Sequence, residues 1–188
     1  MRNKSTAAFI DMGYLSFISK YLGKGKHLKY DVHEIAIELS KKVNFWCEDL
    51  YIFTAPPYQS NEPTEEEKRK KEGYDKMIKK VKAGKLTTWV REGRIQKTNE
   101  GFRQKGVDVL LTLDLMRVAQ TRQFSKLILM TSDTDFVPVI DYIQQHYKTE
   151  IVLAYFTDKK RKSPFSLSNH LWQICKDKIL VNKEYFYS

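Results

Sequence analysis

Aspartates stand beside three separate apolar segments of this sequence, where chemistry that needs oxygen donors could arise. Asp11 closes the first segment, and Asp108 begins a long one. Asp133 and Asp135 directly follow a third. Carboxylates gathered at one place repel one another unless a cation neutralises them, and Mg²⁺ or Mn²⁺ prefers such oxygen ligands. Ions held in this way promote hydrolysis of phosphodiester bonds, because they activate water and assist the leaving oxygen.

Each aspartate also has a simpler explanation when it is taken alone. A single Asp at a strand end commonly caps the next helix or forms a turn. Asp133 or Asp135 could cap a helix that begins near Phe136, and Asp108 could cap its own helix. Three acidic strand ends on the same side are harder to explain by caps. We therefore expect a metal site made of Asp11, Asp108, Asp133 and Asp135.

Further polar residues are candidates for the surroundings of this site. Asp114 lies six residues beyond the first acid of its helix, roughly 9 Å along the axis. If it is buried it needs a partner, such as Lys105 or Arg117, or it orients a metal ligand. Ser132 and Thr134 could position water or a phosphate oxygen, and they could equally cap the following helix.

The charge of the chain favours a polyanionic partner. Lys and Arg number 33 against 23 Asp and Glu, which gives a net charge of +10. Such an excess suits nucleic acid first and an anionic membrane surface second. Phe102 and Tyr14 are candidates to stack on a base. Several basic residues could line a groove that follows a nucleic-acid backbone: Arg91, Arg94, Lys97, Arg103, Lys105, Lys24, Lys26 and the run of residues 159–162. For each of them, ordinary solvation at the surface is the alternative.

The elements that must position these residues alternate along the chain. Strands that are apolar on both faces and alternate with helices indicate a parallel sheet covered on both sides. The carboxyl ends of such strands meet at one edge, where sites form. We predict strands over residues 7–11, 50–54, 87–91 (continuing through 94–96 after a turn), 127–131 and 150–155. After residue 96 we predict a polar, basic loop that ends at residue 105. We predict helices over residues 31–47, 61–85, 106–119, 136–146 and 167–176, the one after residue 105 being buried nearly all round.

Length and composition set the remaining bounds. The chain suits a single domain over residues 1–188. No apolar run approaches the roughly 20 residues that span a bilayer, and the start is no signal peptide. Cys47 and Cys175 are too few for a zinc motif or a disulfide framework, so buried free thiols in helices of a cytoplasmic protein are expected. The aromatic tail at residues 185–187 could pack against another subunit of a homo-oligomer.

Several enzyme classes find little support. A Gly-x-Ser-x-Gly elbow, a Walker A loop and a Gly-x-Gly-x-x-Gly run are all missing from the sequence. A phosphatase built on an Asp-x-Asp pair usually carries the pair on its first strand. Here Asp11 is followed by Met12 and Gly13, which counts against that class.

Three blocks of sequence resemble NYN domains of the LabA-like group, within the PIN-like nuclease superfamily. They are residues 9–15 (FIDMGYL), 105–114 (KGVDVLLTLD) and 131–139 (TSDTDFVPV), in the same order and separation. The resemblance runs from Ala7 to about Val181. It implies an α/β Rossmann-like three-layer sandwich with a mainly parallel sheet of about five strands. It also implies a Mg²⁺ or Mn²⁺ site and endoribonuclease activity on single-stranded or structured RNA, with Asp11, Asp108, Asp133 and Asp135 as the acidic cluster and Asp114 as the second acid of the middle block.

The sequence departs from this family at one position. Three residues after the first aspartate the family has asparagine, and this chain has Tyr14. Met12 likewise replaces the usual glycine. A tyrosine hydroxyl could bond to a phosphate or to water, but it cannot mimic a carboxamide ligand. The alternative function is therefore an RNA-binding or interaction module of the same fold with weak or lost catalysis.

Overall fold

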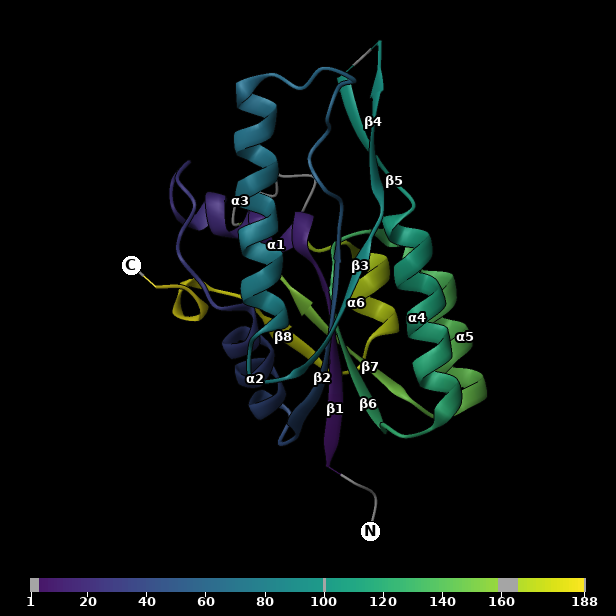
Figure 1. Ribbon diagram of the computed structural model, residues 1–188. Coiled ribbons are helices and arrows are strands. Elements are labelled where there is room, and N and C mark those ends of the chain that lie inside the picture. The colour runs from purple at the N-terminus through teal and green to yellow at the C-terminus, as the bar shows by residue number, and fades with distance from the viewer. Residues whose placement is uncertain (1–3, 100, 159–165, 188) are drawn as a thin grey trace.

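A parallel sheet of six strands forms the centre of the computed structural model, which describes residues 4–99, 101–158 and 166–187 (Figure 1). The strands lie in the order β3-β2-β1-β6-β7-β8, and every neighbouring pair is parallel. The sixth strand, β8, was not predicted, because three residues give too short an apolar pattern. The strands are β1 (Ser5–Asp11), β2 (Trp46–Thr54), β3 (Thr87–Glu92), β6 (Lys126–Met130), β7 (Glu150–Tyr155) and β8 (Lys178–Leu180).

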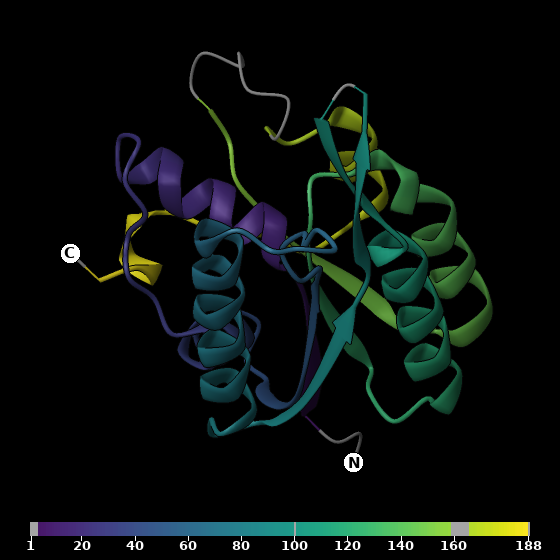
Figure 2. The same ribbon diagram turned by 45° about the horizontal axis from the view of Figure 1, so that its top comes forward.

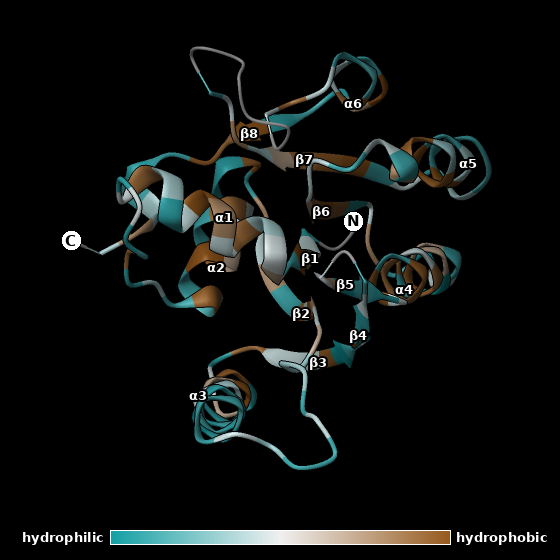
Figure 3. Ribbon diagram, turned by 90° about the horizontal axis from the view of Figure 1, so that it is seen from above, coloured by the Kyte–Doolittle hydropathy of each residue, from teal (hydrophilic) through white to brown (hydrophobic). Residues whose placement is uncertain are grey.

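Helices cover both faces of this sheet, as viewed from above in Figure 3. The three-layer α/β sandwich expected from the alternating elements is confirmed. Two short 3₁₀ turns, η1 (Thr134–Phe136) and η2 (Lys183–Tyr185), complete the structure. One face carries α1 (Met12–Leu22), α2 (Val32–Lys42) and α3 (Glu65–Lys82), and the other carries α4 (Val107–Thr121), α5 (Val137–Tyr147) and α6 (Asn169–Ile174).

The alternation of side chains along each strand produces two separate cores. In β1, Ala8 and Ile10 belong to the core under α1 and α2, while Ala7 and Phe9 belong to the core under α4 and α5. All four are fully buried. Successive residues of a strand point to opposite faces, so a run that is apolar throughout can fill both layers. The central strands are therefore fixed by burial on both sides.

Several helix boundaries differ from those predicted. The helix expected over residues 31–47 ends at Lys42, because Asn44 takes a left-handed conformation (φ 59°) and turns the chain into β2. Trp46 and Cys47 accordingly begin a strand, and Cys47 is half-buried there, whereas Cys175 is buried after α6. The sequence also gave no prediction of α1, whose start depends on capping by Asp11.

One prediction about apolar surfaces was wrong, and another holds for part of its residues. Helix α4 is not buried all round, since Val109 and Leu113 are 62% and 61% exposed. Of the aromatic tail, Tyr187 is exposed, at 53%. Tyr185 and Phe186 are buried against their own chain, and the ring centroids of Phe186 and Tyr30 lie 5.7 Å apart.

An antiparallel hairpin rises beyond the carboxyl edge of the sheet (Figures 1 and 2). Its strands are β4 (Arg94–Thr98) and β5 (Gly101–Lys105), where a loop was predicted after residue 96. A side chain at Gly93 would meet the Lys105 carbonyl oxygen at 2.5 Å, so glycine is needed where the chain leaves β3. Gly106, at φ 83°, turns the chain from the hairpin into α4. Across the described residues, no helix has the length and apolarity to span a membrane.

Candidate active site at the carboxyl edge of the sheet

Asp11 is the last residue of β1, and its carboxylate caps α1. Its Oδ1 accepts hydrogen bonds from the backbone N–H of Gly13 (2.8 Å) and of Tyr14 (3.3 Å). A Cβ atom at Gly13 would lie 3.1 Å from this oxygen, which is tight. The carboxylate is therefore fixed in direction by the first turn of α1, at the carboxyl end of the central strand.

Asp133 and Asp135 follow the neighbouring strand β6. Asp133 Oδ1 accepts from the backbone N–H of Asp135 (2.9 Å) and caps the turn η1. The N–H of Asp133 donates to the hydroxyl of Thr131 at 3.2 Å. Asp133 is half-buried and Asp135 is exposed. The loop after β6 thus presents two acids in a conformation that its own hydrogen bonds maintain.

Asp108 belongs to a helix, since it lies in the first turn of α4. The described helix begins after Gly106 with no side-chain cap, so the capping explanation does not apply to Asp108. The side chain is exposed. The two turns that lead to it, at Gly93 and Gly106, also set the hairpin above the same edge.

These four acids influence one another. Burial raises the pKa of Asp11 above its ordinary value, and the charges of Asp108 and Asp133 raise it further, against the backbone hydrogen bonds that lower it. Burial also raises the pKa of Asp108, as do the charges of Asp133 and Asp135. Acids from β1, from the loop after β6 and from α4 therefore share one electrostatic environment.

The donor chemistry of this cluster suits a hard divalent cation, but its side chains are not drawn together. Carboxylate oxygens are the ligands that Mg²⁺ and Mn²⁺ prefer, and mutual repulsion is what such an ion relieves. In the part of the chain that the structure describes, no three His, Cys, Asp or Glu side chains are gathered as one ion would need. The residue types fit a metal, and the side chains would have to move inward to hold it.

Asp114 lies apart from this cluster in its bonding. It is buried, and its carboxylate accepts from Arg91 Nε (2.6 Å) and from Arg117 (2.9 Å). Of the two partners considered from the sequence, Arg117 is therefore found, and the second partner in the structure is Arg91. Through Arg91, Asp114 joins α4 to β3.

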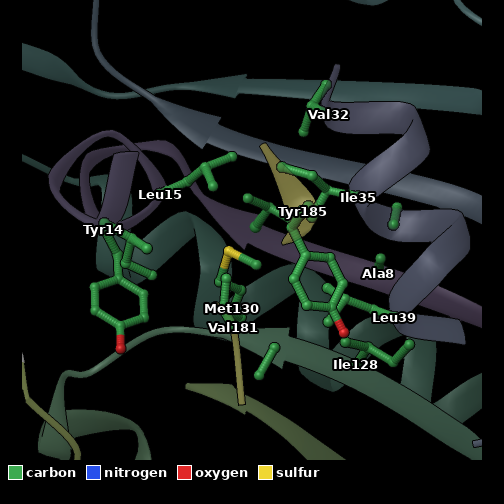
Figure 4. Close-up of a cluster of buried hydrophobic side chains, with 14 of the residues drawn as sticks. Ala8, Tyr14, Leu15, Val32, Ile35, Leu39, Ile128, Met130, Val181 and Tyr185 are labelled. Carbon is green, nitrogen blue, oxygen red and sulfur yellow. The ribbon is translucent and has the colours of Figure 1, made fainter. Parts of the chain in front are cut away.

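Tyr14 is a core residue, so the expectation that it stacks on a base was wrong. It is 2% exposed, and its hydroxyl accepts a hydrogen bond from the backbone N–H of Phe156 at 2.8 Å. Burial raises the pKa of this phenol. Figure 4 shows Tyr14 among the side chains of the buried cluster. The position at which the family has asparagine therefore supplies packing in this chain.

The other predicted residues around the acids are accessible. Ser132 is half-buried and Thr134 is exposed at the start of η1. Thr131, which bonds to the N–H of Asp133, was missed, because its place at the end of β6 gave no sign of a polar role.

The predicted cationic residues gather on the hairpin. Cross-strand pairs point to the same face, and Arg94 pairs with Lys105 while Lys97 pairs with Phe102. Arg94, Lys97, Arg103 and Lys105 are all exposed. Lys24 and Lys26 are exposed in the loop after α1, and the basic run of residues 159–162 lies outside the described residues.

Comparisons with known proteins agree on the fold. The sequence model of the NYN domain family matches residues 5–171. The crystal structure of a protein of unknown function from Vibrio parahaemolyticus is similar, with a TM-score of 0.63 and 15% sequence identity over 99% of this chain and 98% of that chain. At this identity the likeness concerns the fold alone. Curated proteins yield no match.

Proposed function

Because this chain belongs to the NYN domain family, within the PIN-like nuclease superfamily, we propose that it is an endoribonuclease dependent on Mg²⁺ or Mn²⁺. One observation carries the proposal. Asp11, half-buried at the end of β1, has a pKa that burial raises and that the charges of Asp108 and Asp133, from two other segments, raise further. Acids that disfavour one another's ionisation at a sheet edge are typical of a site completed by a cation.

We divide the polar residues at this edge into those that would bind the metal ion and those that would orient water or phosphate. Asp11 and Asp133 have their carboxylates directed by backbone N–H groups, while Asp108 and Asp135 are exposed and able to change rotamer. We assign all four to metal binding, with Ser132 and Thr134 beside them for water or phosphate. A bound ion would supply an activated water and neutralise charge on the leaving oxygen.

The cations of the hairpin are assigned to the substrate. Arg94, Lys97, Arg103 and Lys105 are placed to meet phosphates of RNA before the strand reaches Asp108. We further propose that the chain is a single LabA-like domain that acts in the cytoplasm.

A cleavage assay tests this function. Full-length protein with Mn²⁺ is incubated with labelled RNA and DNA oligonucleotides, and the products are separated by electrophoresis. We expect RNA to be cut, and Asp133→Asn to lower the rate by more than about 100-fold, the upper end for loss of a group that merely orients a metal ligand. Asp141→Asn, which changes an exposed acid on α5, is the matched control. Cleavage by Asp133→Asn at the wild-type rate would show that the site is wrongly assigned.

A second candidate is an RNA-binding module of the same fold that has lost catalysis. The observation that favours it is Tyr14, whose hydroxyl is occupied by Phe156 and does not replace the family's carboxamide. It predicts RNA binding that weakens as salt rises, with no product under any divalent ion. The same assay, together with a binding titration, distinguishes the two.

A further inference from the structure

An aromatic pair, exposed Phe102 and half-buried Tyr58, lies beyond the carboxyl edge of the sheet. Phe102 of β5 is 61% exposed, and its ring centroid lies 5.2 Å from that of Tyr58, with the rings inclined by 45°. Tyr58 comes from a different segment, the loop between β2 and α3. Figure 1 shows this loop passing beside the hairpin. An exposed aromatic ring that is supported by a second, half-buried ring on a charged surface indicates a partner that has flat apolar faces.

The pairing of the hairpin strands puts a cation beside this pair. Lys97 is directly opposite Phe102, so both side chains leave the same face of the hairpin. Side chains alternate between the two faces along each strand, so Arg94, Lys105 and Arg103 point to the opposite face from Lys97 and Phe102. One face of the hairpin is therefore polar and cationic, and the other combines an aromatic ring with a single lysine near its tip.

The segment that carries Tyr58 is held in place before any partner binds. The side chain of Gln59 donates to the carbonyl oxygen of Glu67 (2.8 Å), and the hydroxyl of Ser60 donates to the Glu67 carboxylate (2.8 Å). The same carboxylate accepts from the N–H of Thr64 (2.9 Å) at the start of α3. A pre-positioned ring loses little conformational freedom on binding, which favours affinity.

We propose that Tyr58, Phe102 and Lys97 form a stacking platform that binds a base and a neighbouring phosphate of single-stranded RNA. Bases inside a duplex are covered on both faces by their neighbours, whereas bases of a single strand can stack on aromatic side chains. Phe102 lies three residues along β5 from Lys105, about 10 Å at about 3.4 Å per residue. The platform therefore binds the strand at a distance from the acids. This inference rests on the proposed function for the identity of the strand and adds its class, single-stranded.

A binding experiment without metal tests the platform. Fluorescence anisotropy in EDTA measures the affinity of the full chain for a labelled 12-nucleotide single strand of RNA and for the matching duplex. We expect tighter binding of the single strand. Phe102→Ala and Tyr58→Ala should each weaken single-strand binding about 10-fold and leave duplex binding unchanged, while Phe102→Trp retains it. Lys97→Ala should reduce the slope of log affinity against log salt by about one.

The control changes an exposed aromatic residue at the opposite edge. Trp46 is 54% exposed at the start of β2, and Trp46→Ala should bind both RNAs as the wild type does. Single-strand affinity unchanged in both Phe102→Ala and Tyr58→Ala, or lost equally for single strand and duplex, overturns the platform. Binding in EDTA does not depend on cleavage, so the two proposals can fail separately. If the protein cuts no RNA but Phe102→Ala lowers single-strand affinity, the platform is supported and only the proposed nuclease activity is contradicted. The reverse result contradicts the platform alone.

Discussion

Single carboxylates at this edge serve two purposes at once. Asp11 caps α1 and Asp133 caps η1, and both remain within the electrostatic environment of the other acids. Capping and metal binding are therefore compatible, because a carboxylate has two oxygens and lone pairs on each. Asp108 makes no such cap in the described chain, so its charge can be removed with little effect on local structure.

We predict that Asp108→Asn stabilises the metal-free protein at neutral pH. Folding raises the pKa of Asp108, so the folded state holds this proton more tightly than the unfolded state. Stability then falls as pH rises from the ordinary carboxyl range through the raised pKa. The variant should lose this part of the fall and melt about 1 °C higher at pH 7, a small change because solvent screens an exposed charge. Thermal unfolding in EDTA from pH 4 to pH 8 measures it.

Asp141→Asn separates this effect from the general loss of a negative charge on a basic protein. It should leave the melting temperature and its pH profile as in the wild type. A wild-type profile in Asp108→Asn as well would mean that the repulsion between the acids costs the fold nothing.

At the scale of elements, the edge strand β3 is joined to α4 by one buried acid. Asp114 accepts from Arg91 of β3 and from Arg117 of its own helix. The Arg91 side chain is 31% exposed and that of Arg117 is 56% exposed. Arg91 also lies over the ring of Trp89, 5.8 Å from its centroid. The Arg91 contact is thus the better shielded of the two.

Arg91→Ala should accordingly destabilise the fold more than Arg117→Ala. Loss of the shielded partner leaves a buried carboxylate with one exposed cation, and we expect about 2 kcal/mol. Loss of Arg117 removes an exposed pair, for which about 0.5 kcal/mol is expected. Urea unfolding of both variants gives the two free energies. Equal losses would mean that Asp114 is held as much by its own helix as by β3.

The elements differ in how far they could be predicted. Strands that are buried on both faces appear in the sequence as apolar runs, so β1, β6 and β7 were predicted. Their prediction also gave the sheet edge at which Asp11 and Asp133 lie. The second strand of the hairpin was missed because β5 is exposed along its whole length and has no apolar pattern, whereas residues 94–96 of β4 were predicted as a strand. The contact between Asp114 and Arg91 joins residues 23 positions apart and depends on packing that spacing does not reveal. The burial of Tyr14 escaped prediction for the same reason, since its partner Phe156 is 142 positions away.

For the molecule as a whole, the sign of the net charge is opposite to the charge of the acidic cluster. The chain carries a net charge of +10, yet the acids at the carboxyl edge repel one another. The hairpin, whose cationic side chains are exposed, extends beyond that edge (Figure 2). Under the proposed function, a polyanion would be attracted to the basic molecule, while the acidic site would stay negative until a cation binds.

Binding of a divalent ion should therefore stabilise the whole fold. At a Mn²⁺ concentration of about 100 times the dissociation constant, the gain is about 2.7 kcal/mol. For a protein of this size it raises the melting temperature by roughly 5–10 °C. Asp11→Asn should abolish most of that rise, and Asp141→Asn should keep it. Differential scanning fluorimetry with increasing Mn²⁺ measures the shift, and an equal rise in both variants would place the ion elsewhere.

The hairpin has a consequence for how proteins of this fold can diverge. Among the described residues, neither core includes a side chain from β4 or β5, and glycines mark both ends of the excursion. Its length can therefore change over evolution without repacking the interior. Insertions that add one residue to each strand would exchange the two faces at the tip, whereas two residues in each strand would preserve them. Variation in steps of two would lengthen the reach of the aromatic ring while its surroundings stay the same.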